Sequence, residues 1–410
     1  MATTEKYQNR MLNMTMKVIH FIVDDKFING TIALLDEFDW LENQYYIFTN
    51  KHYFKYITLD RIQKINKHQI LEIITDSNSC DVIVIHGLAS LPSKYICSIN
   101  RQIKVCWLAW GYDIYSNTYP QFPLIKLKDR IRPKTLDLVN TLIYYSKYGL
   151  REGLYRLLPN KRKEHKLFFK AINRFDFFSG VYPIEYKLVK NNPFFRAKPI
   201  LYSYVSLSIK QLYRPNSISN DVLPKGNNIQ VGHCSSILCN HIDTFNRIKK
   251  LNLGDRKIIT PLSYGANNYY VSSVCRAGYK MFRNNFVPLK KFIPKEDYIC
   301  YMSSVSMAIF NIDQQSAAGG IKISLWNGAM VFLPEKSIGY EYFRGMGYIV
   351  FCIEKDLTQE NIEKGLSEEQ IMWNRKLLSS TTTYEILKKQ IMNSFKTIQD
   401  DILSENDVHN

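Results

Sequence analysis

Short apolar segments of strand length alternate with amphipathic segments of helix length along this chain, and the alternation occurs twice. In the first half, apolar runs such as 17–23, 81–86 and 104–110 are separated by helix-like segments. The second half restarts at 229–232 and keeps the same alternation as far as 348–352. Strands that alternate with helices form parallel sheets covered on both faces. The sequence therefore predicts an α/β protein with two doubly wound, Rossmann-like domains.

The chain is long enough for two such domains, because 410 residues exceed what one hydrophobic core usually organises. Residues 133–158 have the pattern of a long helix with a basic face, whereas 159–225 are irregular and end in a cluster of Pro, Asn and Ser, where we place the connection. The predicted layout is an N-terminal domain over 1–225, a C-terminal domain over 226–380, and a helix and tail over 381–410. A ligand cleft between the two sheets would face the carboxyl ends of their strands.

One segment carries most of the net charge of +17. Between Lys126 and Arg174 there are fourteen Lys and Arg against four Asp and Glu, and Lys161, Arg162 and Lys163 are consecutive. Aromatic and aliphatic residues are interleaved with these charges. Such a segment can bind anionic lipid headgroups or nucleic acid, and the alternative is an ordinary solvated helix face. Because no nucleic-acid-binding motif accompanies it, we expect an anionic membrane surface as partner and no nucleic acid.

The sequence also bears on location. No apolar run approaches the roughly 18 residues that a membrane-spanning helix needs. The first apolar stretch contains His20 and is followed by Asp24 and Asp25, unlike a secretory signal. The eight cysteines are scattered and form no Cys-x-x-Cys pair, which is typical of reduced thiols. The expected location is the cytoplasm, peripherally on the inner face of the cell membrane.

Two loops that follow predicted strands of the second half have the composition of phosphate-binding loops. The first carries Gly232, Ser235, Ser236 and Asn240, and the second carries Gln314, Gln315, Ser316, Gly319 and Gly320. Both lead into helices, whose N-terminal N–H groups and dipole attract anions, and small residues let a ligand approach the backbone. A diphosphate bound in this way would need no metal. An ordinary strand-to-helix turn remains the alternative for each loop.

A third loop lies between them and contains Tyr264 and Asn267. Tyr264 could stack on a base or a sugar. Asn267 could cap the following helix or bind ligand, and the sequence favours neither role.

In the first half, two predicted strands end in residues that suit acid–base chemistry. His86 ends one strand, and Trp110 and Asp113 follow the next. Carboxyl ends of parallel strands lie at one edge of a sheet, so these residues should face the same ligand. The aromatic surroundings of Asp113 could raise its pKa and suit it to act as a general base. His86 could do the same or orient an acceptor, although a histidine at a strand end is often a packed core residue.

Metal and hydrolase motifs are missing from the sequence. His233, Cys234, Cys239 and His241 are close in sequence, but their spacing fits no standard zinc site. There is no Asp-x-Asp pair to hold a divalent cation on a diphosphate, no Gly-x-Ser-x-Gly elbow and no Gly-x4-Gly-Lys loop. The sequence therefore predicts neither a metal site nor a cofactor.

Taken in order, these motifs resemble one family of bacterial envelope enzymes. They are His86-Gly87, Trp107-x-x-Trp110-Gly111-x-Asp113-x-Tyr115, Tyr182-Pro183-Ile184-Glu185-Tyr186, Val231-Gly232-His233, Asn240-His241, Pro261-Leu262-Ser263-Tyr264-Gly265, and Gln314-Gln315 with Gly319-Gly320. The family is that of the 4-acetamido-4,6-dideoxygalactose (Fuc4NAc) transferases of enterobacterial common antigen synthesis, often labelled 4-alpha-L-fucosyltransferases. The similarity covers roughly residues 80 to 355.

The resemblance implies a GT-B fold, in which two Rossmann-like domains face a cleft. It also implies a nucleotide-diphosphate deoxysugar donor, dTDP- or UDP-linked, and a polyprenyl-diphosphate-linked glycan as acceptor at the cytoplasmic face of the membrane. Where the family is expected to have a Gly-Asn-Ser phosphate loop, this chain has Gly232-His233-Cys234-Ser235. This departure bears on which residues contact the donor.

These observations predict a metal-independent glycosyltransferase of surface polysaccharide synthesis. The C-terminal domain would bind the donor, and the N-terminal domain would bind the acceptor, with Trp110 near it. Asp113, or Glu185 or His86, would accept the hydroxyl proton if the reaction inverts the anomeric centre. The alternatives are another enzyme of two Rossmann-like domains, such as a nucleotide-sugar epimerase or a glycerophosphotransferase, and a non-catalytic scaffold of a glycan assembly complex.

Overall fold

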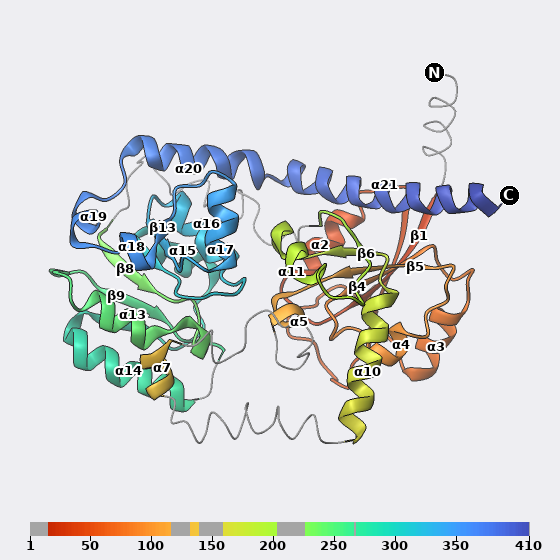
Figure 1. Ribbon diagram of the computed structural model, residues 1–410, viewed down its shortest axis with the longest axis horizontal. Coiled ribbons are helices and arrows are strands. Elements are labelled where there is room, and N and C mark those ends of the chain that lie inside the picture. The colour runs from red at the N-terminus through yellow and green to blue at the C-terminus, as the bar shows by residue number, and fades with distance from the viewer. Residues whose placement is uncertain (1–14, 116–131, 139–158, 203–225, 266–267, 410) are drawn as a thin grey trace. The chain divides into compact units, whose positions relative to one another are not determined.

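The computed structural model describes residues 15–115, 132–138, 159–202, 226–265 and 268–409 (Figure 1). The chain forms two compact units. Unit 1 comprises Met1–Phe122, Tyr155–Ser206 and Tyr384–Asn410, and unit 2 comprises Pro123–Leu154 and Leu207–Thr383. The described residues 132–138 thus belong to unit 2, and the C-terminal helix belongs to unit 1, although each is remote in sequence from the rest of its unit.

Unit 1 contains a parallel sheet with helices around it. Its elements are β1 (Met16–Ile22), α2 (Ile28–Leu35), β2 (Leu41–Ile47), β3 (Gln63–Lys64), α3 (Lys67–Thr75), β4 (Val82–His86), α4 (Ser93–Ile96), β5 (Lys104–Leu108), α5 (Gly111–Tyr115), α10 (Pro159–Arg174), β6 (Phe177–Ser179), η2 (Pro183–Glu185), α11 (Tyr186–Val189), β7 (Lys198–Pro199) and α21 (Tyr384–His409). The strand order is β3-β2-β1-β4-β5-β6-β7, and every neighbouring pair is parallel.

Unit 2 repeats this architecture. Its elements are α7 (Pro133–Leu138), β8 (Asn228–Val231), η3 (Ile237–Cys239), α13 (His241–Ile248), β9 (Ile258–Pro261), α14 (Asn268–Phe282), η4 (Arg283–Asn285), β10 (Phe286–Leu289), α15 (Lys295–Ser303), β11 (Val305–Ile309), α16 (Ala318–Trp326), β12 (Met330–Leu333), α17 (Ile338–Gly345), β13 (Phe351–Cys352), α18 (Ile353–Asp356), α19 (Gln359–Lys364) and α20 (Glu368–Thr381). The order is β10-β9-β8-β11-β12-β13, again all parallel.

The central strands are buried and mostly apolar because helices cover both faces of each sheet. All five residues of β4 and all five of β5 are buried, as are all four of β12. In each sheet the strand order reverses once, between β1 and β4 in unit 1 and between β8 and β11 in unit 2. This arrangement confirms the α/β prediction, and ligands of such sheets bind outside the carboxyl ends of the strands at the reversal.

The long helix α21 packs on unit 1, as Figure 1 shows where it runs beside β1 and α2. Its Ile391, Phe395 and Ile398 are buried in the same hydrophobic core as β1, β2 and β4. Its charged residues also bond to unit 1, where Lys388 reaches Glu37 at 2.6 Å.

Two local predictions were wrong. The amphipathic pattern of residues 61–75 predicts one helix, but these residues form β3 and then α3, because Asn66 and Gln69 build a capping box that starts the helix at Lys67. Residues 159–174, expected to be irregular, form α10, which buries Phe168, Ala171 and Ile172. In this region β6 was not predicted at all. None of the described helices is long and apolar enough to cross a membrane.

Candidate functional site

The two predicted phosphate loops lie side by side in unit 2, at the point where the strand order reverses. The loop after β8 is joined to the end of β11 by a hydrogen bond from Gly232 N to Ile309 O (2.9 Å). The Asn240 side chain donates to Asn311 O (2.9 Å), just beyond β11. The loops that sequence placed in one site are therefore neighbours in the fold.

The side chains of the first loop are used to hold the loop itself. Ser235 donates through its hydroxyl to Tyr264 O, and its backbone N–H bonds to the same oxygen, both at 2.7 Å. Ser236 caps η3 by accepting from Leu238 N. The Ser235 contacts join the loops after β8 and β9, so both serines have structural partners within unit 2.

Gly232 and Asn240 also have structural reasons for their identity. Both have positive φ, +70° and +48°, a region that favours Gly and tolerates Asn. A Cβ at Gly232 would lie 2.6 Å from His241 Nε2, so a side chain there would collide with the imidazole. Asn240 is fully buried and accepts from Arg132 N (2.7 Å) while its amide donates to Asn311.

The second loop ends at a helix N-terminus whose N-cap residue provides no side-chain cap. Ala317 is the N-cap residue of α16 and has φ +57°, and it makes no side-chain cap bond. Gly319 and Gly320 occupy the first turn, which contains no acidic residue. The unbonded N–H groups of such a turn attract an anion. Before this turn, Gln314, Gln315 and Ser316 are half-buried.

By contrast, the other helix at this edge is poorly suited to an anion. The first turn of α13 contains Asp243. The Asp243 carboxylate accepts from Lys134 N (3.0 Å) and Thr135 N (2.7 Å) and so caps the N-terminus of α7. Its negative charge opposes anion binding at α13, so of the two helices that follow β8 and β11 at the strand-order reversal, α16 is favoured.

Two basic residues near α16 were not predicted from the sequence as part of this site. Lys322 lies in the second turn of α16, where burial lowers its pKa to about 8. Arg132 bonds to Asp313, in the loop before α16, at 2.7 Å. The only sequence signal was the glycine-rich turn ahead of Lys322, whereas Arg132 lies some 180 residues away in the chain.

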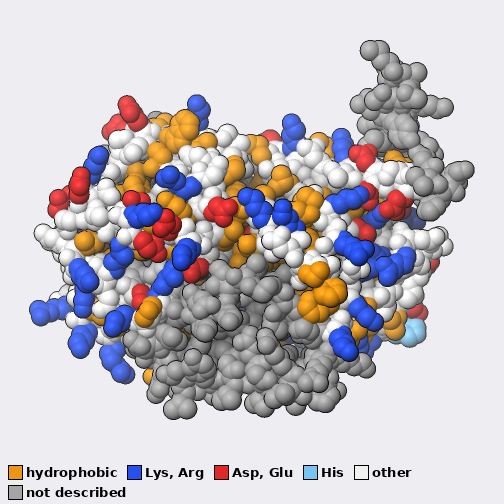
Figure 2. Space-filling model, viewed as in Figure 1, with side chains coloured by type: hydrophobic (Ala, Val, Ile, Leu, Met, Phe, Trp, Pro, Cys, Tyr) orange, Lys and Arg blue, Asp and Glu red, His pale blue; other side chains and the backbone are white. Residues whose placement is uncertain are grey.

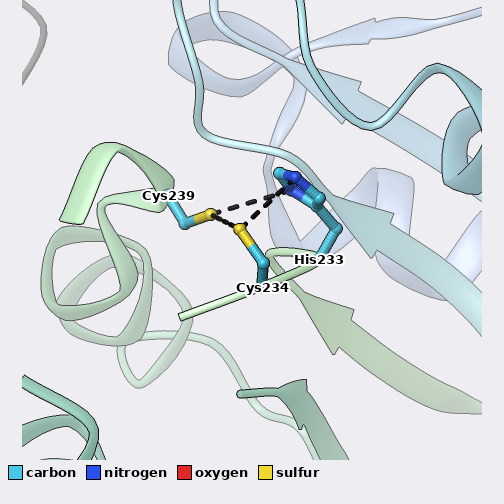
Figure 3. A group of neighbouring side chains, drawn as sticks. All are labelled: His233, Cys234 and Cys239. Atoms are coloured by element: carbon cyan, nitrogen blue, oxygen red, sulfur yellow. Dashed lines mark hydrogen bonds between the residues drawn. The ribbon is translucent and has the colours of Figure 1, made fainter. Parts of the chain in front are cut away.

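Two thiols and one imidazole meet in the loop after β8 (Figure 3). Cys234 Sγ lies 3.6 Å from Cys239 Sγ and 3.4 Å from His233 Nε2, and Cys239 Sγ lies 3.7 Å from His233 Nδ1. We call His233, Cys234 and Cys239 the thiol–imidazole cluster. Hydrogen bonding from Cys239 holds the pKa of the Cys234 thiol below its usual value. His233 Nε2 also lies 3.0 Å from Ser316 Oγ, which links the cluster to the second loop.

In unit 1, Asp113 joins the loops after β4 and β5. It is fully buried and accepts three hydrogen bonds, from Leu88 N (3.0 Å), Trp110 N (2.9 Å) and Trp107 Nε1 (3.2 Å). Burial raises the pKa of Asp113 to about 7, and these hydrogen bonds oppose the rise. The carboxyl group thus lies near its titration point at neutral pH, as a general base requires, while it also holds two loops together.

Glu185 lies at the same edge of the sheet, beyond β6. Strands β5 and β6 are neighbours, with Leu108 paired to Ser179. Glu185 is fully buried, and its Oε2 accepts from Tyr182 N at 2.8 Å. Burial raises the pKa of Glu185 to about 7, partly offset by the Tyr182 N–H and the Tyr115 hydroxyl. A Cβ at Gly180 would lie 2.9 Å from this carboxylate, so the glycine makes room for it.

His86 belongs to a series of hydrogen-bonded polar side chains inside unit 1. Its Nε2 lies 3.0 Å from His20 Nδ1, and His20 Nε2 lies 3.0 Å from Asn43 Oδ1. Burial lowers the pKa of His20 to about 4 and that of His86 well below 6.5. Both imidazoles are therefore neutral at pH 7. This arrangement favours the packing role over the catalytic role for His86.

The fold is identified by comparison with known proteins. No protein-family model matches the sequence, and no curated protein does. A glycosyltransferase from Rickettsia africae superposes with a TM-score of 0.60 at 10% identity, over 94% of this chain and 99% of that one. The trehalose 6-phosphate synthase of Burkholderia multivorans gives 0.55 at 8% identity, over 97% and 99%. An O-GlcNAc transferase mutant of Thermobaculum terrenum gives 0.56 at 10% identity, over 96% and 69%. The fold is GT-B.

Within this GT-B chain, the structure describes some of the predicted site residues and not others. Asn267 lies outside the described residues, as do the side chains of Lys161, Arg162 and Lys163, whose backbone lies in the first turns of α10.

Trp110 packs edge-on against Tyr112, with ring centroids 5.8 Å apart. Tyr264 is 57% exposed and could stack on a ligand. Figure 2 shows Lys and Arg side chains of the described residues spread over the visible face in small groups with Asp and Glu between them.

Proposed function

We propose that this protein is a glycosyltransferase that moves a sugar from a nucleoside diphosphate to a hydroxyl group of an acceptor. One observation carries the proposal: the N-terminus of α16, whose N-cap residue Ala317 makes no side-chain cap bond, lies at the strand-order reversal of unit 2 in a GT-B fold. Breaking the bond between sugar and nucleotide leaves a diphosphate whose charge must be stabilised. Preorganised N–H groups that point at developing charge are among the largest contributions to such catalysis.

The donor would bind to unit 2 with its diphosphate at Gly319 and Gly320. Ser316 and Lys322 would add a hydroxyl and a positive charge, and Gln314 or Gln315 could bond to the sugar. Tyr264 would stack on the base or the sugar. No Mg²⁺ or Mn²⁺ would be needed on the diphosphate, because the helix dipole and the lysine supply the positive potential.

The acceptor would bind to unit 1, near Trp110. Asp113 would take the proton of the attacking hydroxyl if the reaction inverts the anomeric centre, and Glu185 is the second choice. Both are supported by pKa values raised to about 7 and by their place at the carboxyl edge of the sheet. His86 is a weaker choice because its Nε2 is engaged by His20.

The finer assignment rests on the sequence motifs. Their resemblance to Fuc4NAc transferases supports a dTDP- or UDP-linked deoxyamino sugar as donor and a polyprenyl-diphosphate-linked glycan of bacterial surface polysaccharide synthesis as acceptor. Such an acceptor is anchored in the membrane. The basic residues between Lys126 and Arg174, including Lys161, Arg162 and Lys163, would hold the protein peripherally at the anionic inner face.

The donor site can be tested by thermal unfolding with dTDP, UDP and GDP, with and without Mg²⁺. A ligand at a hundred times its Kd stabilises the folded state by about 2.7 kcal/mol. We expect one nucleotide to raise the midpoint temperature without Mg²⁺, and Gly320→Ala to reduce that rise. The added methyl would lie 3.6 Å from Phe310 and 3.9 Å from Tyr298, which is ordinary contact, so the fold should tolerate it.

Gly345→Ala is the matched control, because a Cβ there meets nothing within 4 Å. Both substitutions should slightly stabilise the unliganded protein, by roughly 0.5–1 kcal/mol in a helix. Equal nucleotide responses in the two variants would remove α16 from the donor site. If no nucleoside diphosphate changes the unfolding of the wild type, the proposed function itself fails.

A further inference from the structure

The thiol–imidazole cluster of His233, Cys234 and Cys239 has the chemistry of a metal site, although the spacing of these residues in the sequence argued against one. We propose that these three side chains bind one Zn²⁺ ion. Two cysteine sulfurs and one imidazole nitrogen are a soft donor set, which favours zinc over the hard cations Mg²⁺ and Ca²⁺. The proposal concerns a second feature of unit 2 and does not depend on the glycosyltransferase activity.

The distances within the cluster match those of a tetrahedral zinc site. Zinc binds sulfur at about 2.3 Å and imidazole nitrogen at about 2.0–2.1 Å, so ligand atoms in a tetrahedron lie roughly 3.5–3.8 Å apart. The two sulfurs are 3.6 Å apart, and Cys239 Sγ is 3.7 Å from His233 Nδ1. All three ligand atoms lie within 4.8 Å of one another. Small side-chain rotations would therefore complete the coordination.

The second ring nitrogen of His233 already has the partner that a zinc-bound histidine needs. Ligating histidines usually donate their other N–H to a nearby oxygen, which fixes the tautomer and the ring orientation. With Nδ1 on the metal, His233 Nε2 carries the proton and donates to Ser316 Oγ, which lies at 3.0 Å. This hydrogen bond favours Nδ1 as the ligand. Cys234 Sγ, which lies 3.4 Å from Nε2, would then have to turn toward Nδ1, and a fourth position is left for water.

The surroundings favour an ion with two negative ligands. Cys234 and Cys239 are buried and pack on Ile312. Two thiolates in this setting would be costly on their own, but with Zn²⁺ they form a neutral group. The loop is also shaped around the sulfur, because a Cβ at Gly265 would lie 3.4 Å from Cys234 Sγ, and Gly265 has φ +112°.

Zinc in this position would fix two loops at once. It would join His233 and Cys234 to Cys239 at the end of η3, and through Ser316 it would hold the segment before α16. The ion would thus order the loops at the strand-order reversal of unit 2. It would hold loops together, so it differs from a cation that bridges the phosphates of a substrate.

Cobalt is a direct probe of this site. The full-length protein would be stripped of metal under a non-thiol reductant and titrated with Co²⁺ without oxygen. We expect visible d–d bands of tetrahedral Co²⁺ and a thiolate-to-cobalt charge-transfer band, saturating at one ion per chain and reversed by Zn²⁺. Cys234→Ser and Cys239→Ser should each abolish the charge-transfer band or weaken it strongly, and Zn²⁺ should raise the midpoint temperature of the wild type but not of these variants.

Cys275→Ser and Cys300→Ser are the controls, because neither cysteine belongs to the cluster, and both should retain the bands. His233→Asn should weaken Co²⁺ binding and leave the thiolate band in part. The proposal is overturned if the reduced wild-type protein shows no thiolate-to-cobalt band, an outcome that requires no variant to fold. It is also overturned if the band survives in both Cys→Ser variants. Neither the Co²⁺ titration nor the thermal unfolding with Zn²⁺ measures sugar transfer, so failure of the zinc proposal leaves the proposed function intact.

Discussion

Two carboxyl groups at the carboxyl edge of the unit 1 sheet are buried, and burial changes what they do at neutral pH. Asp113 and Glu185 would be fully ionised in water, yet each has a pKa of about 7 in the folded protein. Each also accepts backbone N–H groups that hold a loop after a strand. A residue of this kind can position a loop and exchange a proton, and the two roles predict different effects of substitution.

The effect of Asp113→Asn on the free energy of unfolding should depend on pH. The unfolded chain loses this proton near the ordinary Asp pKa of 3.8, whereas the folded protein keeps it to about 7. Between these values the folded state binds more protons, so this residue makes the wild-type free energy of unfolding fall as pH rises. The wild-type minus Asp113→Asn difference in unfolding free energy should therefore shrink from about pH 4 to 7, by about 1.4 kcal/mol per unit of pKa shift.

Denaturant titrations at several pH values measure this difference, and Glu185→Gln should follow the same course. A difference that grows with pH would mean that the carboxylate is stabilised as an anion. Donor turnover adds the functional test, since Asp113→Asn should lower sugar transfer far more than nucleotide binding to unit 2. Unchanged turnover would leave Asp113 a positioning residue only.

Sequence predicted candidate residues in loops that the fold brings together, but it could not show which of these side chains hold the loops themselves. Ser235 and Ser316 have similar contexts after predicted strands, yet Ser235 bonds to Tyr264 O while Ser316 bonds to His233. Cys234 and Cys239 seemed too irregularly spaced for a metal, but η3 folds one sulfur back to the other. Such contacts depend on loop conformation, which apolar periodicity does not encode.

At the level of elements, prediction succeeded where burial fixes the pattern and failed where elements are short or polar. Strands β4 and β5 are buried and mostly apolar, so the apolar runs at 81–86 and 104–110 predicted them directly. Strand β6 has only three residues, too few to show a pattern. The first turns of α10 are rich in Lys and Arg, which obscured the apolar stripe that follows.

The N-terminus of α16 offers a test that changes charge with little change in shape. Asp and Asn are close in size, and both tolerate the positive φ of Ala317. A carboxylate at this N-cap would take the place of the diphosphate charge and repel it, whereas an amide would not. We expect Ala317→Asp to weaken nucleotide binding by about 1–2 kcal/mol relative to Ala317→Asn, or roughly tenfold in Kd.

Isothermal titration of both variants with the nucleotide selected by the thermal screen measures this difference. High salt should reduce it, because exposed charges are screened. Equal affinities for the two variants would show that the diphosphate does not approach α16, whatever the fate of the zinc proposal.

On the scale of the whole molecule, two parallel sheets of the same topology account for the length of the chain, and this much was readable from the repeated alternation. The pairing of remote segments was not. Helix α21 belongs to the unit that the chain left some 180 residues earlier, and Lys388 meets Glu37 across 351 positions. Its apolar stripe predicts a helix that must pack on something, but the stripe does not say on what.

Phe395 tests whether α21 is part of the unit 1 core and whether the two units respond separately. It is 2% exposed, and its ring lies 6.4 Å from those of His20 and Tyr202. Phe395→Ala should cost about 3–5 kcal/mol of unit 1 stability, because it removes a buried ring and leaves a cavity. Tyr53→Ala, at a side chain that is 80% exposed in the same unit, should cost little. In calorimetry, the unit 1 transition of Phe395→Ala should move to lower temperature while the nucleotide-dependent shift of unit 2 persists. Loss of the nucleotide shift in Phe395→Ala but not in Tyr53→Ala would show that donor binding depends on the unit 1 core.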